Sequence, residues 1–190
     1  ALEALARLPE TEENRQRNVD VLIKRVSSSW GADSLEQNMT RLFEAESLAK
    51  ELPGPDGTPG GDRLRLARIH FSMGRVHYGT NKMPEAIGYF QQVLEVAEEL
   101  DDAELVALPS LTSGAVMLVQ VHLDKAKSLL SKAIPASAQM GTWPEWSRAV
   151  GYHGIALSMS GDCAAGVAEV QRALARSKEI SSLRDIAMSN

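Results

Sequence analysis

Several features that define common protein classes are missing from this 190-residue sequence, and each absence excludes a class. The single cysteine, Cys163, can form neither an internal disulfide nor a zinc site built from several thiolates, which favours a reducing cytoplasm. Aromatic residues make up only 5% of the chain and helix-favouring residues are abundant, so an all-β domain is disfavoured. The formal net charge of -5 offers no basic field for a phosphate backbone, and nucleic acid is therefore not expected as a partner.

Long apolar runs are also scarce. Only residues 105–123 lack acidic and basic side chains over nearly the length that crosses a bilayer. Because Pro109, Gly114 and several polar residues interrupt this run, we expect a helix buried in its own fold and no membrane partner. Residues 1–9 lack the apolar core of a secretory signal, which again favours a cytoplasmic location.

The strongest positive signal is an internal repeat with a period of 40 residues. Gly74, Gly114 and Gly154 are spaced at this interval, each within a helical pattern where glycine costs about 1 kcal/mol relative to alanine. That cost predicts close contact between helices at these positions. Two further columns with the same spacing are Ala86, Ala126 and Gly166, all small, and Phe90, Leu130 and Val170, all large and apolar.

Each repeat unit shows helical spacing twice, separated by turn or helix-start residues, and therefore predicts a helical hairpin. A less regular unit precedes the three regular ones. The predicted fold is all-α, a right-handed α-solenoid of about four hairpins in a single array over residues 1–190. The expected hairpins cover residues 12–52, 63–100, 104–140 and 144–180.

The first two hairpins are joined by residues 53–62, seven of which are proline or glycine, so we expect a flexible surface loop. No lysine follows it in the spacing of a phosphate-binding loop, because Arg63 and Leu64 come next. Residues 1–8 have the pattern of a second helix and residues 183–189 that of another first helix. Since repeat arrays normally end in polar capping units, we expect a segment of a longer protein, with homodimerisation through exposed repeat faces as one consequence.

The units resemble tetratricopeptide (TPR) repeats, which carry a small residue within the first helix, another early in the second, and a large apolar residue four positions later. Gly74, Ala86 and Phe90 show this pattern best, whereas the usual aromatic residues of the first helix are missing from the later units. A 40-residue period, together with strings such as residues 4–11 and 143–157, is similar to the repeat regions of bacterial signalling ATPases of the AAA or STAND type.

That resemblance implies a non-catalytic protein-interaction or signal-input module. In such proteins an ATPase module, often joined to a nucleotide-cyclase or kinase domain, precedes the array, and none of their catalytic motifs is present in this sequence. The expected partners are a protein or peptide, with an acidic peptide among the candidates, or other domains of the same parent chain. A small-molecule sensing array that controls the attached ATPase is the main alternative, and a phosphatase acting on a response regulator is a weaker one.

Local charge suggests where a partner would bind. Residues 63–84 contain four arginines and Lys82 but no acidic residue, although the whole chain is acidic. At 100° per residue, two arginines and two aromatic residues form one stripe of the predicted helix, which in a TPR-like array would face the concave groove. The candidate groove residues are Arg68, Phe71, Arg75 and Tyr78, joined by Leu111, Leu118 and Arg148 from the next two units.

The arginines have a second possible role. The acidic run Glu95, Glu98, Glu99, Asp101 and Asp102 lies on the neighbouring predicted helix, and the arginines could pair with it instead of with a ligand. Exposed pairs of this kind stabilise little. Both interpretations remain open at the level of sequence.

Other candidate chemistry is weak, and we expect no enzyme, no cofactor and no metal. His70 and His77 are seven residues apart, about 10 Å along a helix, which is too far for one metal ion, so packed or hydrogen-bonded histidines are expected. His122 is expected at a turn. His153 could in principle pair with Cys163, but a small buried cysteine is the favoured interpretation.

Two tryptophans, Trp143 and Trp146, flank Pro144. They are expected to pack against the preceding hairpin at a helix start, with a binding role as the alternative.

Overall fold

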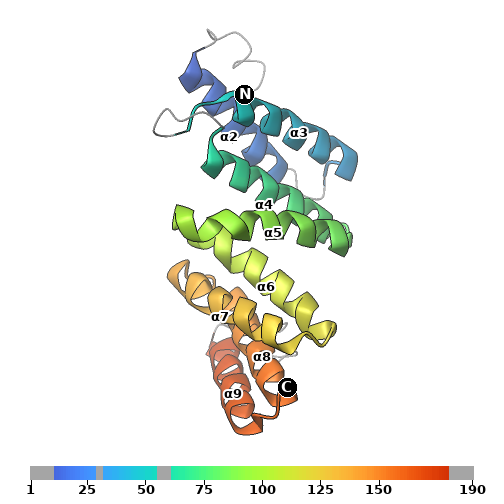
Figure 1. Ribbon diagram of the computed structural model, residues 1–190, viewed down its shortest axis with the longest axis vertical. Helices are drawn as coiled ribbons and strands as arrows, with labels where there is room; N and C mark the ends of the chain where they lie inside the picture. The colour runs from blue at the N-terminus through green and yellow to red at the C-terminus, as the bar shows by residue number, and fades with distance from the viewer. Residues whose placement is uncertain (1–10, 29–31, 55–60, 180–190) are drawn as a thin grey trace. The chain divides into compact units, whose positions relative to one another are not determined.

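The computed structural model describes residues 11–28, 32–54 and 61–179, and these parts of the chain contain eight α-helices and no strand. Consecutive helices pair into hairpins, which confirms the all-α, α-solenoid fold class predicted from the sequence (Figure 1). The predicted helices at residues 1–8 and 183–189, and residues 55–60 of the predicted loop, lie outside the described residues. The helices are α2 (Glu12–Ser28), α3 (Leu35–Glu51), α4 (Arg63–Gly79), α5 (Met83–Leu100), α6 (Ala103–Val119), α7 (Leu123–Gln139), α8 (Trp143–Met159) and α9 (Cys163–Glu179).

The helices from α4 onward begin at regular steps of 20 residues, at positions 63, 83, 103, 123, 143 and 163. The three hairpins that these helices form begin and end within one residue of the bounds expected from the sequence. The 40-residue period of the side chains therefore contains a finer backbone period of 20.

The turns explain this finer period. A residue with positive φ stands in the turn after each helix from α4 to α8: Asn81, Asp101, Val121, Gly141 and Gly161. After α4, the backbone N–H of Lys82 donates to the carbonyl of His77, and that of Asn81 donates to the carbonyl of Tyr78. These two bonds form a Schellman motif, which satisfies the last carbonyls of a helix. The same pair of bonds occurs around Val121, Gly141 and Gly161.

The repeated glycines lie where two helices of a hairpin cross, as the sequence predicts. A Cβ atom at Gly74 would lie 2.5 Å from Cε1 of Phe90, and one at Gly114 would lie 2.7 Å from Cγ of Leu130. At Gly154 the nearest atom would be the backbone oxygen of Gly166, also at 2.7 Å. All these distances are shorter than real Cβ contacts, so a side chain added at any of these positions would force its neighbour to shift.

The described residues divide into two compact units, one ending at Val96 and one beginning at Ala97, within α5. The sequence predicts a single array over residues 1–190. Its repeat signal cannot locate this division, because the column of Phe90, Leu130 and Val170 continues across it.

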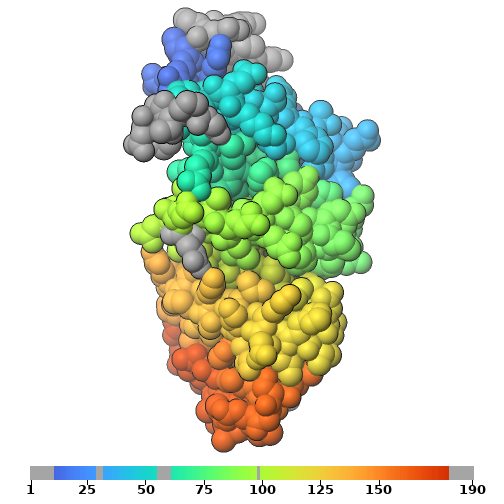
Figure 2. All heavy atoms as spheres, viewed as in Figure 1, coloured from blue at the N-terminus to red at the C-terminus, as the bar shows by residue number. Residues whose placement is uncertain are grey.

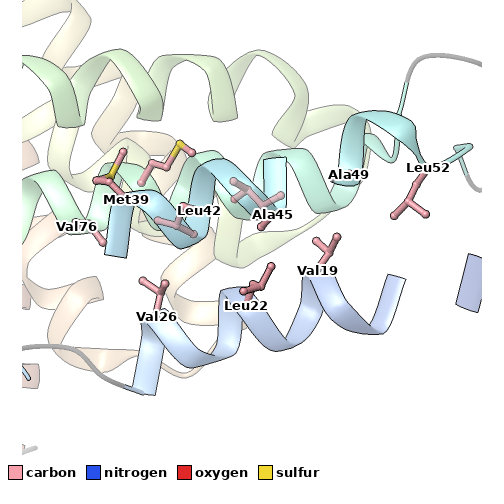
Figure 3. Close-up of a cluster of buried hydrophobic side chains, with 11 residues drawn as sticks. Val19, Leu22, Val26, Met39, Leu42, Ala45, Ala49, Leu52 and Val76 are labelled. Atoms are coloured by element: carbon pink, nitrogen blue, oxygen red, sulfur yellow. The ribbon is translucent and has the colours of Figure 1, made fainter. Parts of the chain in front are cut away.

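The core of the first unit is formed by side chains that α2 and α3 direct toward each other (Figure 3). Val19, Leu22 and Val26 of α2 face α3, and all three are almost completely buried. Their spacing of three and four residues is that of one helix face, which explains why this less regular hairpin still folds as a helix pair. Contributions from α3, the following turn and α4 complete the cluster: Met39, Leu42, Ala45, Ala49, Leu52, Ile69, Met73 and Val76.

The core of the second unit relies on smaller side chains. Leu130 of α7 packs with Leu111 and Leu118 of α6 and with alanines of α7 and α8. In the space-filling view, the atoms of α6 and α7 adjoin one another (Figure 2). The long uncharged stretch predicted to be a buried helix coincides largely with α6, most of which is buried. Among the described helices, none has the length and apolar character needed to cross a bilayer.

Candidate functional site

The seven candidate groove residues belong to both units, and the structure describes them as two sets. The first set lies on α4. Asp62 caps the start of this helix, and its side chain accepts a hydrogen bond from the backbone N–H of Arg65 at 3.0 Å. Arg68 is exposed, Arg75 is half-buried and Tyr78 is 39% exposed. Three of these four residues thus have surface in contact with solvent.

The fourth, Phe71, is buried, and the prediction that it lies on an exposed face is wrong. The residue is 6% exposed, and the centroid of its ring lies 6.3 Å from that of the Phe90 ring. The guanidinium of Arg75 lies 5.7 Å from the Phe71 ring centroid, a distance at which a cation is attracted to an aromatic face. Phe71 therefore contacts the guanidinium of Arg75 and helps to position it.

The second set is also less exposed than predicted. Leu111 and Leu118 of α6 are 4% and 8% exposed and belong to the core of their unit, so their placement on an open face is wrong. Arg148 of α8 is half-buried, and its guanidinium lies 2.8 Å from the carboxylate of Glu145 one turn earlier.

The error has a single physical cause. The angular argument assumes that a first helix buries one stripe and exposes the opposite one. In the structure, α6 packs against α7 of its own hairpin and also against α8, the first helix of the next hairpin. A helix with neighbours on two sides buries much more than one stripe, and only a narrow strip remains exposed.

An ion-pair network at the start of α4 was not expected from the sequence. Arg65 donates two hydrogen bonds to Asp20 of α2, from Nε to Oδ1 at 2.9 Å and from Nη2 to Oδ2 at 2.8 Å. It also donates to Asp62 at 2.5 Å. The hydrogen bonds to Asp20 contribute most to raising the pKa of Arg65 above its usual value, followed by Asp62, although burial opposes them.

This network bears on the internal-pairing interpretation. Arg65 does pair within the protein, but with Asp20 and Asp62 and not with the acidic run at residues 95–102. The Asp62 contact follows from its place before the helix, a signal visible in the sequence. The Asp20 contact joins residues 45 positions apart, and no local pattern reveals it.

A second polar cluster joins α3, α4 and α5. Nε2 of His70 lies 3.3 Å from Oε1 of Glu46, so His70 is hydrogen-bonded as predicted. Burial opposes ionisation of Glu46, but its hydrogen bonds to Lys50 and His70 outweigh that effect and lower its pKa. Tyr89 lies beside both histidines and stacks on His77 with ring centroids 5.6 Å apart.

For His77 and Tyr89, the surroundings favour the neutral form of the side chain. Burial lowers the pKa of His77, and burial together with the charge of Glu46 raises the pKa of Tyr89. The predicted packed role of His77 is confirmed by the stacking. No group of three metal-ligating side chains occurs in the part of the chain that the structure describes.

The predicted alternative of a Cys163–His153 pair gains no support. Cys163 is exposed, and its Sγ lies 3.8 Å from the backbone oxygen of Ser158, so the expectation of a buried cysteine is wrong. Cys163 is the first residue of α9, directly after the turn that follows α8, and its side chain is exposed to solvent there. His153 is half-buried, and burial lowers its pKa. His122 stands in the turn before α7, as expected.

The two tryptophans contact the second helix of their own hairpin. The guanidinium of Arg176 lies 4.1 Å from the ring centroid of Trp143, and that of Arg172 lies 5.2 Å from that of Trp146. The indoles lie edge to face, 6.1 Å apart. These contacts tie the start of α8 to the end of α9, whereas the sequence predicts contact with the preceding hairpin.

Fold and surface together define the class as a helical-repeat protein. No family model matches the chain, and no curated protein matches it. Among solved structures, the chain is similar to BtubC (BKLC) from P. vanneervenii, with a TM-score of 0.67 and 15% sequence identity over 94% of this chain and 72% of that one. At this identity the similarity concerns the fold alone.

Proposed function

We propose that this chain is a non-catalytic protein-interaction module that binds a segment of another polypeptide, or of its own parent chain, on the exposed strip of α4. Its place is in a cytoplasmic bacterial regulator with a TPR-like array as the signal-input part. The main support is the surface of α4, where Arg68 and Tyr78 are exposed and Arg75 rests over the Phe71 ring.

The chemistry of this strip suits recognition. Arginine forms planar, charge-assisted hydrogen bonds, and tyrosine offers apolar area with a polar end. Both residue types are enriched where proteins bind one another. Since α4 packs between neighbouring helices of its unit, its backbone presents these side chains in a fixed arrangement.

The test is selection of binders from a display library of random 12-residue peptides, followed by measurement of their affinity. We expect the wild-type chain to select peptides, and the pair Arg68→Glu with Arg75→Glu to lose most of that binding while keeping its helical content by circular dichroism. The pair Lys125→Glu with Lys178→Glu makes the same change of charge on exposed residues elsewhere and should bind normally. Failure to select any peptide would overturn the proposal.

A further inference from the structure

The hairpin of α4 and α5 carries a pair of polar rings where the next hairpin carries apolar side chains. His77 of α4 occupies the position that Met117 and Leu157 hold one and two periods later, and Tyr89 of α5 occupies that of Leu129. All these residues are half-buried. Since methionine and leucine occupy the position in the later hairpins, packing of the repeat does not require a histidine there. What the histidine adds is a group that titrates near neutral pH.

The ring pair of His77 and Tyr89 joins the two helices of this hairpin. The ring centroids lie 5.6 Å apart, and the ring planes are 11° from parallel. Nδ1 of His77 is buried and has no hydrogen-bond partner among the residues that the structure describes. In a charged imidazole both nitrogens carry a proton, so Nδ1 would become a buried donor without an acceptor. The contact therefore suits the neutral ring.

The other ionisable groups around the ring pair come from α3, from the turn before α5 and from α5 itself. They are Glu46, Lys50, Lys82 and Glu85. Glu85 favours a proton on His77 and Lys82 opposes it, but burial has the largest influence and lowers the pKa of His77. Glu46 is hydrogen-bonded to His70, one helical face away from any direct contact that would hold a proton on His77.

We propose that the stack of His77 on Tyr89 is a pH switch, which holds α5 against α4 while His77 is neutral and loosens when His77 takes a proton. The folded chain binds this proton less readily than the unfolded chain does. The stack therefore contributes its full stability above about pH 6.5, the ordinary pKa of histidine, and loses it as the pH falls further.

Acid acts in the opposite direction on the other side of α4. A charged His70 pairs more strongly with the carboxylate of Glu46, 3.3 Å away, than a neutral one does. Protonation of the two histidines thus loosens α4 from α5 and tightens α4 to α3. The switch does not depend on what the exposed strip of α4 binds.

The first experiment is a proton NMR titration of the histidine ring signals in the full chain, from about pH 8 to about pH 5. The signal of His77 is assigned by its absence from His77→Met, which introduces the residue found at position 117. We expect it to titrate below the ordinary value of about 6.5, and to move towards that value in Tyr89→Leu. Titration of His77 above the ordinary value would overturn the switch, because the Tyr89 face would then hold the imidazolium.

The second experiment compares the Tm at about pH 7.5 and about pH 5.5, a range in which carboxylates stay ionised. Acid should lower the Tm of the wild type, and it should lower that of His77→Met by about 2–4 °C less. His122→Gln, which changes an exposed histidine in a turn, should behave as the wild type does. Equal losses in the wild type and His77→Met would overturn the switch.

Hydrogen exchange then locates the loss. After correction for the intrinsic effect of pH, acid should accelerate amide exchange in the first turns of α5 more than in α3. An acceleration spread evenly over both helices would show general acid destabilisation and would also overturn the switch.

Discussion

Two sets of recurring positions in this protein obey different rules. Where the helices of a hairpin cross, the residue is glycine at all three repeats, Gly74, Gly114 and Gly154. In the turns, the residue with positive φ is asparagine, aspartate or glycine at four positions, types that adopt this conformation readily, but valine at position 121. The crossings thus carry one residue type, whereas the turns carry asparagine, aspartate, valine and glycine.

The difference arises from what each position touches. A side chain at a crossing would overlap atoms of another helix, and relieving that overlap means shifting a packed side chain or moving the helices apart. A side chain in a turn points into solvent, and the backbone hydrogen bonds of the Schellman motif maintain the turn whatever the residue. The cost there is local strain of about 1–2 kcal/mol. Tertiary contact therefore restricts the sequence much more than local backbone conformation does.

The largest effect is expected from Gly154→Ala. The new methyl group would lie 2.7 Å from the backbone oxygen of Gly166, which no side-chain rotation can move away. We expect a loss of about 2–3 kcal/mol in the free energy of unfolding, in the range of overpacked cores. Thermal and urea denaturation followed by circular dichroism measure this loss.

Gly114→Ala provides the matched comparison. Its new methyl group would meet the side chain of Leu130, at 2.7 Å from Cγ, and a side chain can shift. A loss of about 1 kcal/mol or less is expected, since alanine also favours the helix. Equal losses at the two positions would show that backbone contact is not what distinguishes them.

A smaller effect of opposite sign is expected at the turns. Val121 has φ of 61°, a genuine outlier for a β-branched residue, and its side chain is 61% exposed. Val121→Gly should raise the free energy of unfolding by about 0.5–1 kcal/mol, because relief of strain exceeds the entropy that glycine adds to the unfolded chain. Denaturation curves measured in parallel with the wild type provide the test.

The reverse substitution, Gly161→Val, should destabilise by about 1–2 kcal/mol, since φ at this position is 98°. If both substitutions left stability unchanged, the turns would carry no strain, and the contrast with the crossings would be larger still.

The same contrast determines how much of the structure could be predicted from the sequence. The crossing glycines and their large partners repeat every 40 residues, so the hairpins and their contacts were visible. The 20-residue period of the turns was not visible, because Asn81, Asp101 and Val121 share a backbone conformation and no side-chain property.

The candidate site was predicted less completely. Arg68 and Tyr78 are exposed as expected, but Phe71 is buried by contacts that depend on Phe90 of the next helix. A helical wheel contains only one helix and cannot represent such contacts. For the same reason the bond between Arg65 and Asp20, across 45 residues, appeared only in the structure.

An effect as small as that at Val121 is expected at a glycine that belongs to neither set. Gly88 lies within α5, and a Cβ atom built there would have no neighbour within 4 Å. Without a contact that requires it, this glycine only weakens its helix, so Gly88→Ala should stabilise the protein by about 0.5–1 kcal/mol. Gly74→Ala is the control on the preceding helix, where the ring of Phe90 occupies the space and a loss of stability is expected. If Gly88→Ala instead destabilised the chain in the same denaturation assay, a contact absent from the described structure would have to occupy the outer face of α5.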